Sequence, residues 1–211
     1  MENIETYSDR IREYMEEKNA ARDRALQSSR ILIRHCSKAI RAVHRKERDL
    51  ATKHIQEAQA MVRTLQDELH AYPDLYHAGY TQSALKEFAE ASIVFALVGG
   101  ESLPDPDDLN IEYSAYLGGM AEAAGELRRR TLDILRHDSI EEAERLLAAM
   151  DEIYGQLVTF DFPDAITGGL RRLTDMVRGV TERTRGDLTT SIQQRELRSA
   201  LLSVERKLDR S

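Results

Sequence analysis

Three observations predict that this chain folds as an all-α protein. Alanine, leucine, glutamate, arginine and glutamine dominate long stretches, and these residues favour helices. Only four prolines and eleven glycines interrupt the 211 residues. No stretch alternates polar and apolar residues for long enough to indicate a strand. We therefore expect a seven-helix antiparallel bundle that forms a single domain over residues 1–211.

Breaks in the helical pattern place the first three helices at 4–47, 49–70 and 81–98. The segment "AYPDLYHAGY" separates the second helix from the third, because Pro73 holds the residue before it in an extended conformation and Gly79 follows. Gly99 and Gly100 then provide a C-terminal stop for the third helix.

The remaining four helices follow the loop "ESLPDPDDLN", whose two prolines cannot continue a helix. The fourth helix is expected at 111–136. Asp138 and Ser139 can cap a fifth, which ends near residue 158. Pro163-Asp164 opens a sixth helix that reaches residue 185. Gly186-Asp187 is expected to separate it from a seventh, which ends near residue 208.

The single cysteine, Cys36, excludes an intramolecular disulfide and a multi-cysteine metal site. It shares the apolar side of its helix with Ile33, Ile40 and Val43, so we expect it to be a buried apolar residue. No signal peptide or membrane-spanning segment is recognised. These features predict a soluble cytoplasmic protein with no membrane partner.

A basic helix face is the first candidate for function. Residues 24–46 contain seven Lys or Arg and no acid, although the whole chain has a net charge of −7. Five of these cations fall within an arc of roughly 80° on the helix, and we call them the basic stripe: Arg30, Arg34, Lys38, Arg41 and Arg45. His44 lies in the same run and is a further candidate contact. The stripe is long enough to contact several phosphates of a nucleic acid, and we favour this interpretation. The alternative is a solvated face that pairs with acids of a neighbouring helix or subunit.

A pair of acids in "ALKEFAEASIVFALVGG" is the second candidate. Glu87 and Glu90 lie on one edge of a helix whose later turns are apolar on every side. A helix that is apolar all round is normally buried, and unpaired buried carboxylates are very unfavourable. Either arginines or a divalent cation must therefore compensate the two acids.

The fourth helix carries a second pair, Glu122 and Glu126, in "YLGGMAEAAGEL". The surrounding glycines and alanines would let another helix or a ligand approach closely. One interpretation is a charged outer face that pairs locally with Arg129 and Arg130. The other is that carboxylates from two helices bind Mg²⁺ or Mn²⁺, which prefer hard oxygen ligands.

Three segments, in this order, make the chain resemble the translin superfamily, which contains translin and translin-associated factor X (Trax). "SSRILIRHCSKAIRAVHR" is similar to the N-terminal pattern of the family, "GYTQSALKEFAEA" to the E-x-x-E-A segment of Trax, and "AYLGGMAEAAGELRR" to its later Y-L…G-E-L segment. The resemblance covers nearly the whole chain. The chain resembles a prokaryotic, archaeal member of the family that forms a homo-oligomer.

This resemblance implies an all-helical protein in a hollow closed oligomer, typically an octamer, that binds single-stranded RNA and single-stranded DNA. It also implies a Mg²⁺-dependent or Mn²⁺-dependent endoribonuclease of the Trax type. Glu87 and Glu90 match the two glutamates of E-x-x-E, and Glu122 and Glu126 match the two acids of the later segment. All four are then expected to be both metal ligands and catalytic residues.

One departure bears on the activity, because Glu122 stands where Trax has aspartate. The extra methylene moves the carboxylate by about a bond length, and errors of about 1 Å can be costly in a catalytic site. Two alternatives to a nuclease therefore stay open. One is an oligomer that binds RNA and single-stranded DNA without cutting them, as translin does, and the other is a helical scaffold with no nucleic-acid role.

Overall fold

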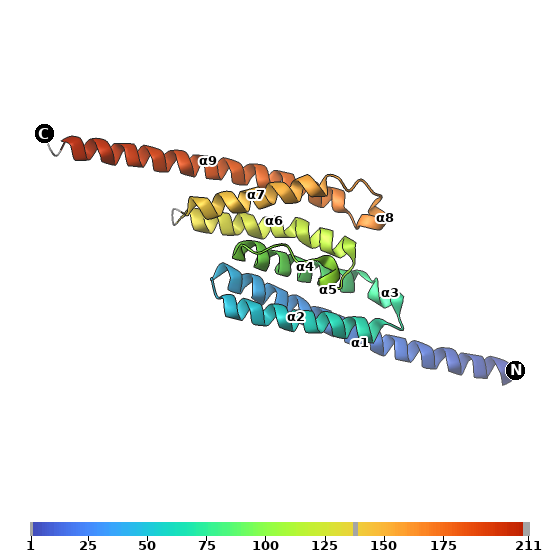
Figure 1. Ribbon diagram of the computed structural model, residues 1–211. Coiled ribbons are helices and arrows are strands. Elements are labelled where there is room, and N and C mark those ends of the chain that lie inside the picture. The colour runs from blue at the N-terminus through green and yellow to red at the C-terminus, as the bar shows by residue number, and fades with distance from the viewer. Residues whose placement is uncertain (1, 137–138, 209–211) are drawn as a thin grey trace. The chain divides into compact units, whose positions relative to one another are not determined.

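The computed structural model describes residues 2–136 and 139–208, and every regular element in these ranges is a helix (Figure 1). Six helices are long: α1 (Glu2–His44), α2 (Arg48–Leu69), α4 (Gly79–Gly99), α6 (Tyr113–Leu135), α7 (Ile140–Leu157) and α9 (Leu170–Leu208). Three helices are single turns: α3 (Pro73–Tyr76), α5 (Pro106–Leu109) and α8 (Asp164–Thr167). The all-α prediction is confirmed.

The predicted break at Gly186-Asp187 is wrong, because α9 continues through both residues. The interruption lies earlier, at Gly168 and Gly169, which both adopt positive φ angles of 62° and 84°. Glycine reaches this region without steric cost, so the pair ends α8 and allows α9 to start afresh. Gly186 has no atom within 4 Å of where a Cβ would lie, and such a glycine weakens a helix without ending it.

Other helix ends lie within two or three residues of their predicted positions. Helix α1 ends at His44, and Lys46 then takes a positive φ of 62°. The amide of Glu47 donates to the carbonyl of Ala42, which is the Schellman arrangement found at helix ends. Asp138, half of the predicted cap of α7, lies outside the described residues. Ser139 takes the capping position, but its side chain makes no capping hydrogen bond.

The chain forms two compact units. The first comprises Met1–Phe95 and Leu103–Gly119, and its main feature is the pair of helices α1 and α2, which run side by side in opposite directions (Figure 1). The core of this unit contains Leu32, Leu65 and Phe88, all fully buried. Cys36 is also fully buried, as predicted, and its burial raises the pKa of the thiol.

The second unit comprises Ala96–Ser102 and Met120–Ser211, and it contains α7 packed on α9. Leu127, Leu146 and Met150 are fully buried in its core. Arg145 of α7 donates to the carbonyls of Leu97 and Val98 at the end of α4, with distances of 2.6 and 3.3 Å. These last carbonyls have no partner within their own helix, so the arginine caps α4. Helices α4 and α6 contribute residues to both units, and the single-domain expectation stays a prediction.

Candidate nucleic-acid interface and acidic residues

The basic stripe follows the outer face of α1. All five of its side chains are exposed, whereas Leu32, Cys36 and Ala39 on the opposite face are fully buried. None of the five cations forms an ion pair with an acid in the part of the chain that the structure describes. An exposed row of cations is suited to anionic ligands such as phosphates. The sixth candidate, His44, differs from the stripe because it is half-buried.

Glu87 and Glu90 lie on α4 in the first unit, and neither is exposed. Their neighbours Leu85, Phe88 and Ala89 are fully buried, so this part of the helix is embedded in the core. Both carboxylates are close enough to the buried thiol of Cys36 to raise its pKa further, after the larger effect of burial. The acidic edge of α4 is therefore half-buried and lies near Cys36 on the apolar face of α1.

Helix α6 meets α4 at the turn that carries these two acids. A Cβ on Gly119 would lie 2.5 Å from the Cβ of Ala89, 2.6 Å from the carbonyl oxygen of Lys86 and 2.7 Å from the amide nitrogen of Glu90. Only glycine permits such an approach, because no real Cβ atom comes so close to its neighbours. The prediction that small residues of this segment allow close helix packing is confirmed at Gly119.

Glu122 follows Gly119 on α6, three residues further along the chain. It is half-buried, and the alanines on either side of it, Ala121 and Ala123, are fully buried. Its position thus differs from the charged outer face that is the alternative interpretation of this segment.

Glu126, one turn beyond Glu122, fits the alternative interpretation better. Its carboxylate lies 3.7 Å from the guanidinium of Arg129, and the arginine side chain is mostly exposed. Arg130 does not take part in such local pairing, contrary to that interpretation. It is 5% exposed and donates from Nε and Nη2 to Oε1 of Glu142 on α7, at 2.9 and 2.7 Å.

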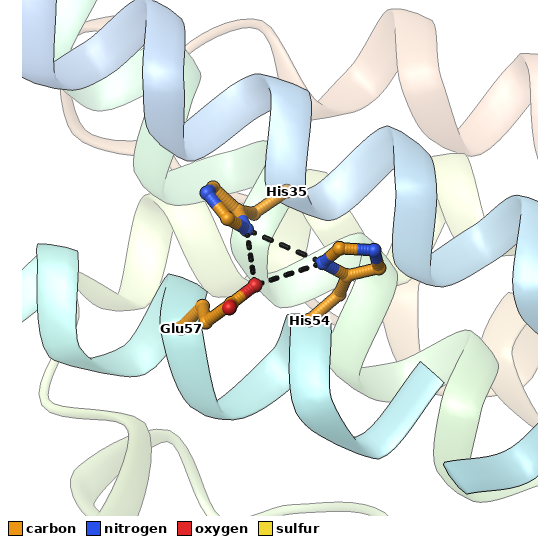
Figure 2. Close-up of side chains that lie close together, drawn as sticks. All are labelled: His35, His54 and Glu57. Atoms are coloured by element: carbon orange, nitrogen blue, oxygen red, sulfur yellow. Dashed lines mark hydrogen bonds and ion pairs between the residues drawn. The ribbon is translucent and has the colours of Figure 1, made fainter. Parts of the chain in front are cut away.

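A cluster on α1 and α2 was not predicted. His35, His54 and Glu57 lie together, with Nδ1 of His35 2.8 Å from Oε2 of Glu57 (Figure 2). The spacing of His54 and Glu57, three residues apart on a helix, would have placed them on one face. The sequence carries no signal that His35 of another helix joins them.

No helix among the described residues is long and apolar enough to cross a membrane.

Comparison with known proteins identifies relatives over most of the chain. No family model matches the sequence. An uncharacterized protein of the archaeon Methanocaldococcus jannaschii is 31% identical over 194 residues, which cover 91% of this chain and 86% of that protein. Among solved structures, the crystal structure of AfC3PO has a TM-score of 0.84 and 31% identity, covering 90% of this chain and 98% of AfC3PO.

Two further solved structures are similar. A complex of AfC3PO with duplex RNA has a TM-score of 0.78 and 32% identity, over 90% of this chain and 98% of that one. The crystal structure of apo-NeC3PO has a TM-score of 0.80 and 21% identity, over 87% and 96% of the two chains, and it shows the same fold. The helical fold is thus that of C3PO-type proteins. The chain belongs to the translin superfamily, in agreement with the three sequence segments that resemble it.

Proposed function

We propose that this protein is an RNA-binding, divalent-metal-dependent endoribonuclease that cleaves single-stranded RNA inside a hollow homo-oligomer. The observation that carries the proposal is the position of Glu87 and Glu90. Both acids are half-buried on the turn of α4 that Gly119 approaches most closely. Carboxylate oxygens are the ligands that Mg²⁺ and Mn²⁺ prefer, so two such groups on one half-buried turn are suited to binding such a cation.

RNA binding is supported by the basic stripe and by one relative. The five exposed cations follow α1 without acidic partners among the described residues. AfC3PO, 32% identical to this chain, has been solved with duplex RNA. Exposed cations of this kind contact phosphates, so we expect RNA binding that depends little on the base sequence and strongly on the salt concentration. Single-stranded DNA would bind through the same phosphates and be cut poorly.

Glu87, Glu90 and Glu122 are the proposed ligands of one Mg²⁺ or Mn²⁺ ion. The donor set fits these metals because it consists of carboxylate oxygens, without the sulfur and imidazole ligands that favour zinc. Glu126 is proposed as a further ligand or as the base that orients water. Its carboxylate lies 3.7 Å from the guanidinium of Arg129.

The reaction is hydrolysis of a phosphodiester. When bound, the metal ion supplies activation of water and neutralisation of the charge that develops on the phosphate. Water attacks the phosphorus in line with the 3′ oxygen, the P–O3′ bond breaks, and the products carry 5′-phosphate and 3′-hydroxyl ends. The acidic residues would hold the cation and orient the water, and the basic stripe would position the RNA strand that is cut.

Assembly is supported by apolar side chains that lie exposed at the two ends of the chain. They recur at spacings of three and four residues, as in coiled-coil seams. The α1 seam consists of Ile4, Tyr7, Ile11, Tyr14 and Met15, and the α9 seam of Leu197, Leu201, Val204 and Leu208. Acids predominate beside the first seam and basic residues beside the second. We propose that these seams are covered by other copies of this chain in a closed homo-oligomer, an octamer.

A non-catalytic binding protein is the second candidate, favoured by Glu122 in the place of the Trax aspartate. Cleavage by the wild type separates the two. A nuclease cuts RNA, and Glu122→Asp should keep or raise its rate, whereas the second candidate binds RNA without cutting it.

The experiment that tests the proposal is cleavage of end-labelled RNA, single-stranded and duplex, by the purified protein. Mg²⁺, Mn²⁺ and excess chelator are compared under otherwise equal conditions. We expect cleavage of single-stranded RNA with either metal and none with chelator. Equal cleavage in chelator would exclude the metal mechanism. Binding without cleavage in either metal would favour the second candidate.

A further inference from the structure

We propose that His35, His54 and Glu57 form a second metal site, specific for a transition-metal cation such as Zn²⁺ and separate from the proposed magnesium site. Three potential ligand atoms converge there (Figure 2). Nδ1 of His35 lies 3.3 Å from Nδ1 of His54. Oε2 of Glu57 lies 2.8 Å from the first nitrogen and 2.9 Å from the second.

The local structure fixes this convergence. His54 and Glu57 are three residues apart on α2 and thus share the face that packs against α1. His35 projects from α1 into the same space between the two helices (Figure 2). The side chains are 20%, 13% and 38% exposed in the order His35, His54, Glu57, so the group is partly shielded but reachable from solvent.

Among the neutral forms of the two rings, hydrogen bonding satisfies this arrangement in only one. A neutral imidazole carries one proton, on Nδ1 or on Nε2. If both rings carry it on Nδ1, two N–H groups point at one oxygen with their nitrogens 3.3 Å apart. If either ring carries it on Nε2, a nitrogen lone pair faces the carboxylate oxygen at less than 3 Å. A cation between the three atoms removes the conflict, because it accepts all three lone pairs.

The ligand set and the spacing indicate which cations fit. Two imidazole nitrogens and one carboxylate oxygen are ligands of zinc sites, whereas Mg²⁺ prefers oxygen alone. Bonds of about 2.0–2.1 Å at tetrahedral angles separate neighbouring ligand atoms by about 3.3–3.4 Å. The two nitrogens already have this separation, and a shift of Glu57 by roughly half an ångström would complete the site. Three protein ligands leave a fourth position for water or another ligand.

Such a site would act on the helix that carries the basic stripe. His35 directly follows Arg34 and precedes Lys38 by three residues in the sequence. A metal bound there links α1 to α2 by coordinate bonds, so it should stabilise the folded protein and hold the stripe in place. Binding requires neutral imidazoles and should therefore weaken as the pH falls.

The test is titration of the metal-free full-length protein with Co²⁺, a spectroscopic substitute for Zn²⁺. We expect one Co²⁺ per chain, with visible absorption typical of tetrahedral nitrogen and oxygen coordination, that an excess of Mg²⁺ does not displace. The substitution His54→Gln should weaken binding by more than about 100-fold, because loss even of an outer partner of a ligand costs about 10–100-fold. The same loss is expected for Glu57→Gln. The matched control is His70→Asn at an exposed histidine that follows the C-terminal end of α2, which should leave binding unchanged.

A second readout separates ligation from an effect on folding. Zn²⁺ should raise the thermal unfolding temperature of the wild type and of His70→Asn, but not of His54→Gln. If His54→Gln does not fold, His35→Gln replaces it in both measurements. Absence of stoichiometric Co²⁺ binding at neutral pH, or binding that both ligand variants keep, would overturn the proposal. Neither result depends on RNA cleavage, so the second site and the proposed nuclease can fail separately.

Discussion

Replacing Gly119 by alanine tests whether the contact between α4 and α6 determines both stability and the acidic turn. The new Cβ would lie 2.5 Å from the Cβ of Ala89, and ordinary contacts begin at 3.4 Å, so the two helices must separate by about 0.9 Å. The other two close atoms, of Lys86 and Glu90, belong to the backbone and cannot rotate away. Overpacking of this kind costs about 3 kcal/mol at the upper end, and the better helix propensity of alanine returns about 1 kcal/mol.

We therefore expect Gly119→Ala to lower the free energy of unfolding by about 2 kcal/mol, measured by urea denaturation followed by circular dichroism. The turn with Glu87 and Glu90 would shift by nearly 1 Å, so RNA cleavage should fall by about 10²-fold. The matched control is Gly125→Ala on the same helix, where a Cβ meets nothing within 4 Å. It should stabilise the protein by about 0.5–1 kcal/mol. Equal effects of the two substitutions would refute the close contact.

Three further predictions address the stripe, a buried ion pair and assembly. Glutamate in place of Arg34, Lys38 and Arg41 should greatly weaken RNA binding. The slope of log affinity against log salt concentration should become shallower by about 2 for single-stranded RNA, because each lost phosphate contact contributes about 0.7. The substitution Glu142→Ala should destabilise the protein by about 3 kcal/mol in thermal or urea unfolding, because it leaves the buried charge of Arg130 without its partner. The wild type should elute and scatter light as an oligomer at micromolar concentration, and Ile11→Asp in the exposed α1 seam should shift it toward the 24.0 kDa monomer.

Two of these predictions have a control in the same chain. Reversal of three arginines of α1 outside the stripe, Arg10, Arg12 and Arg22, makes the same charge change and should weaken RNA binding much less. The exposed pair of Arg178 and Asp175 is a control for the buried pair, and Asp175→Ala should change stability by less than about 1 kcal/mol. A wild-type protein that is a monomer would contradict the oligomer, and an unchanged salt slope in the triple variant would remove the stripe from RNA binding.

Helix positions could be predicted wherever local residues determine them. Pro73, Gly99 and the loop with two prolines set helix ends through backbone restrictions that act within a few residues, and these ends were predicted closely. The break expected at Gly186 does not occur, because a single glycine in a helix costs only about 1 kcal/mol and packing of the surrounding turns can outweigh it. The pair Gly168-Gly169 ends a helix because its backbone takes positive φ angles, which the sequence does not reveal.

In the candidate sites, too, only features that depend on a single helix could be predicted. Periodicity along one helix was sufficient to place the stripe on an exposed face and Glu87 and Glu90 on an inner edge, because both depend on one helix alone. Partners on other helices could not be predicted. Arg130 pairs with Glu142 on α7, not with its neighbours on α6, and His35 meets His54 and Glu57 across two helices. Such pairs depend on how the helices pack against one another, and a single sequence does not directly reveal that packing.

The proposal that these acids are the active site is tested by two measurements on Glu90→Gln, the rate of RNA cleavage and the affinity for the same RNA. The amide keeps the size of the side chain and removes the charge that would hold a cation. We expect cleavage in Mg²⁺ to be abolished, whereas RNA binding stays at the wild-type level or becomes slightly tighter. Cleavage by Glu90→Gln at the wild-type rate would contradict it and show that these acids are not the active site.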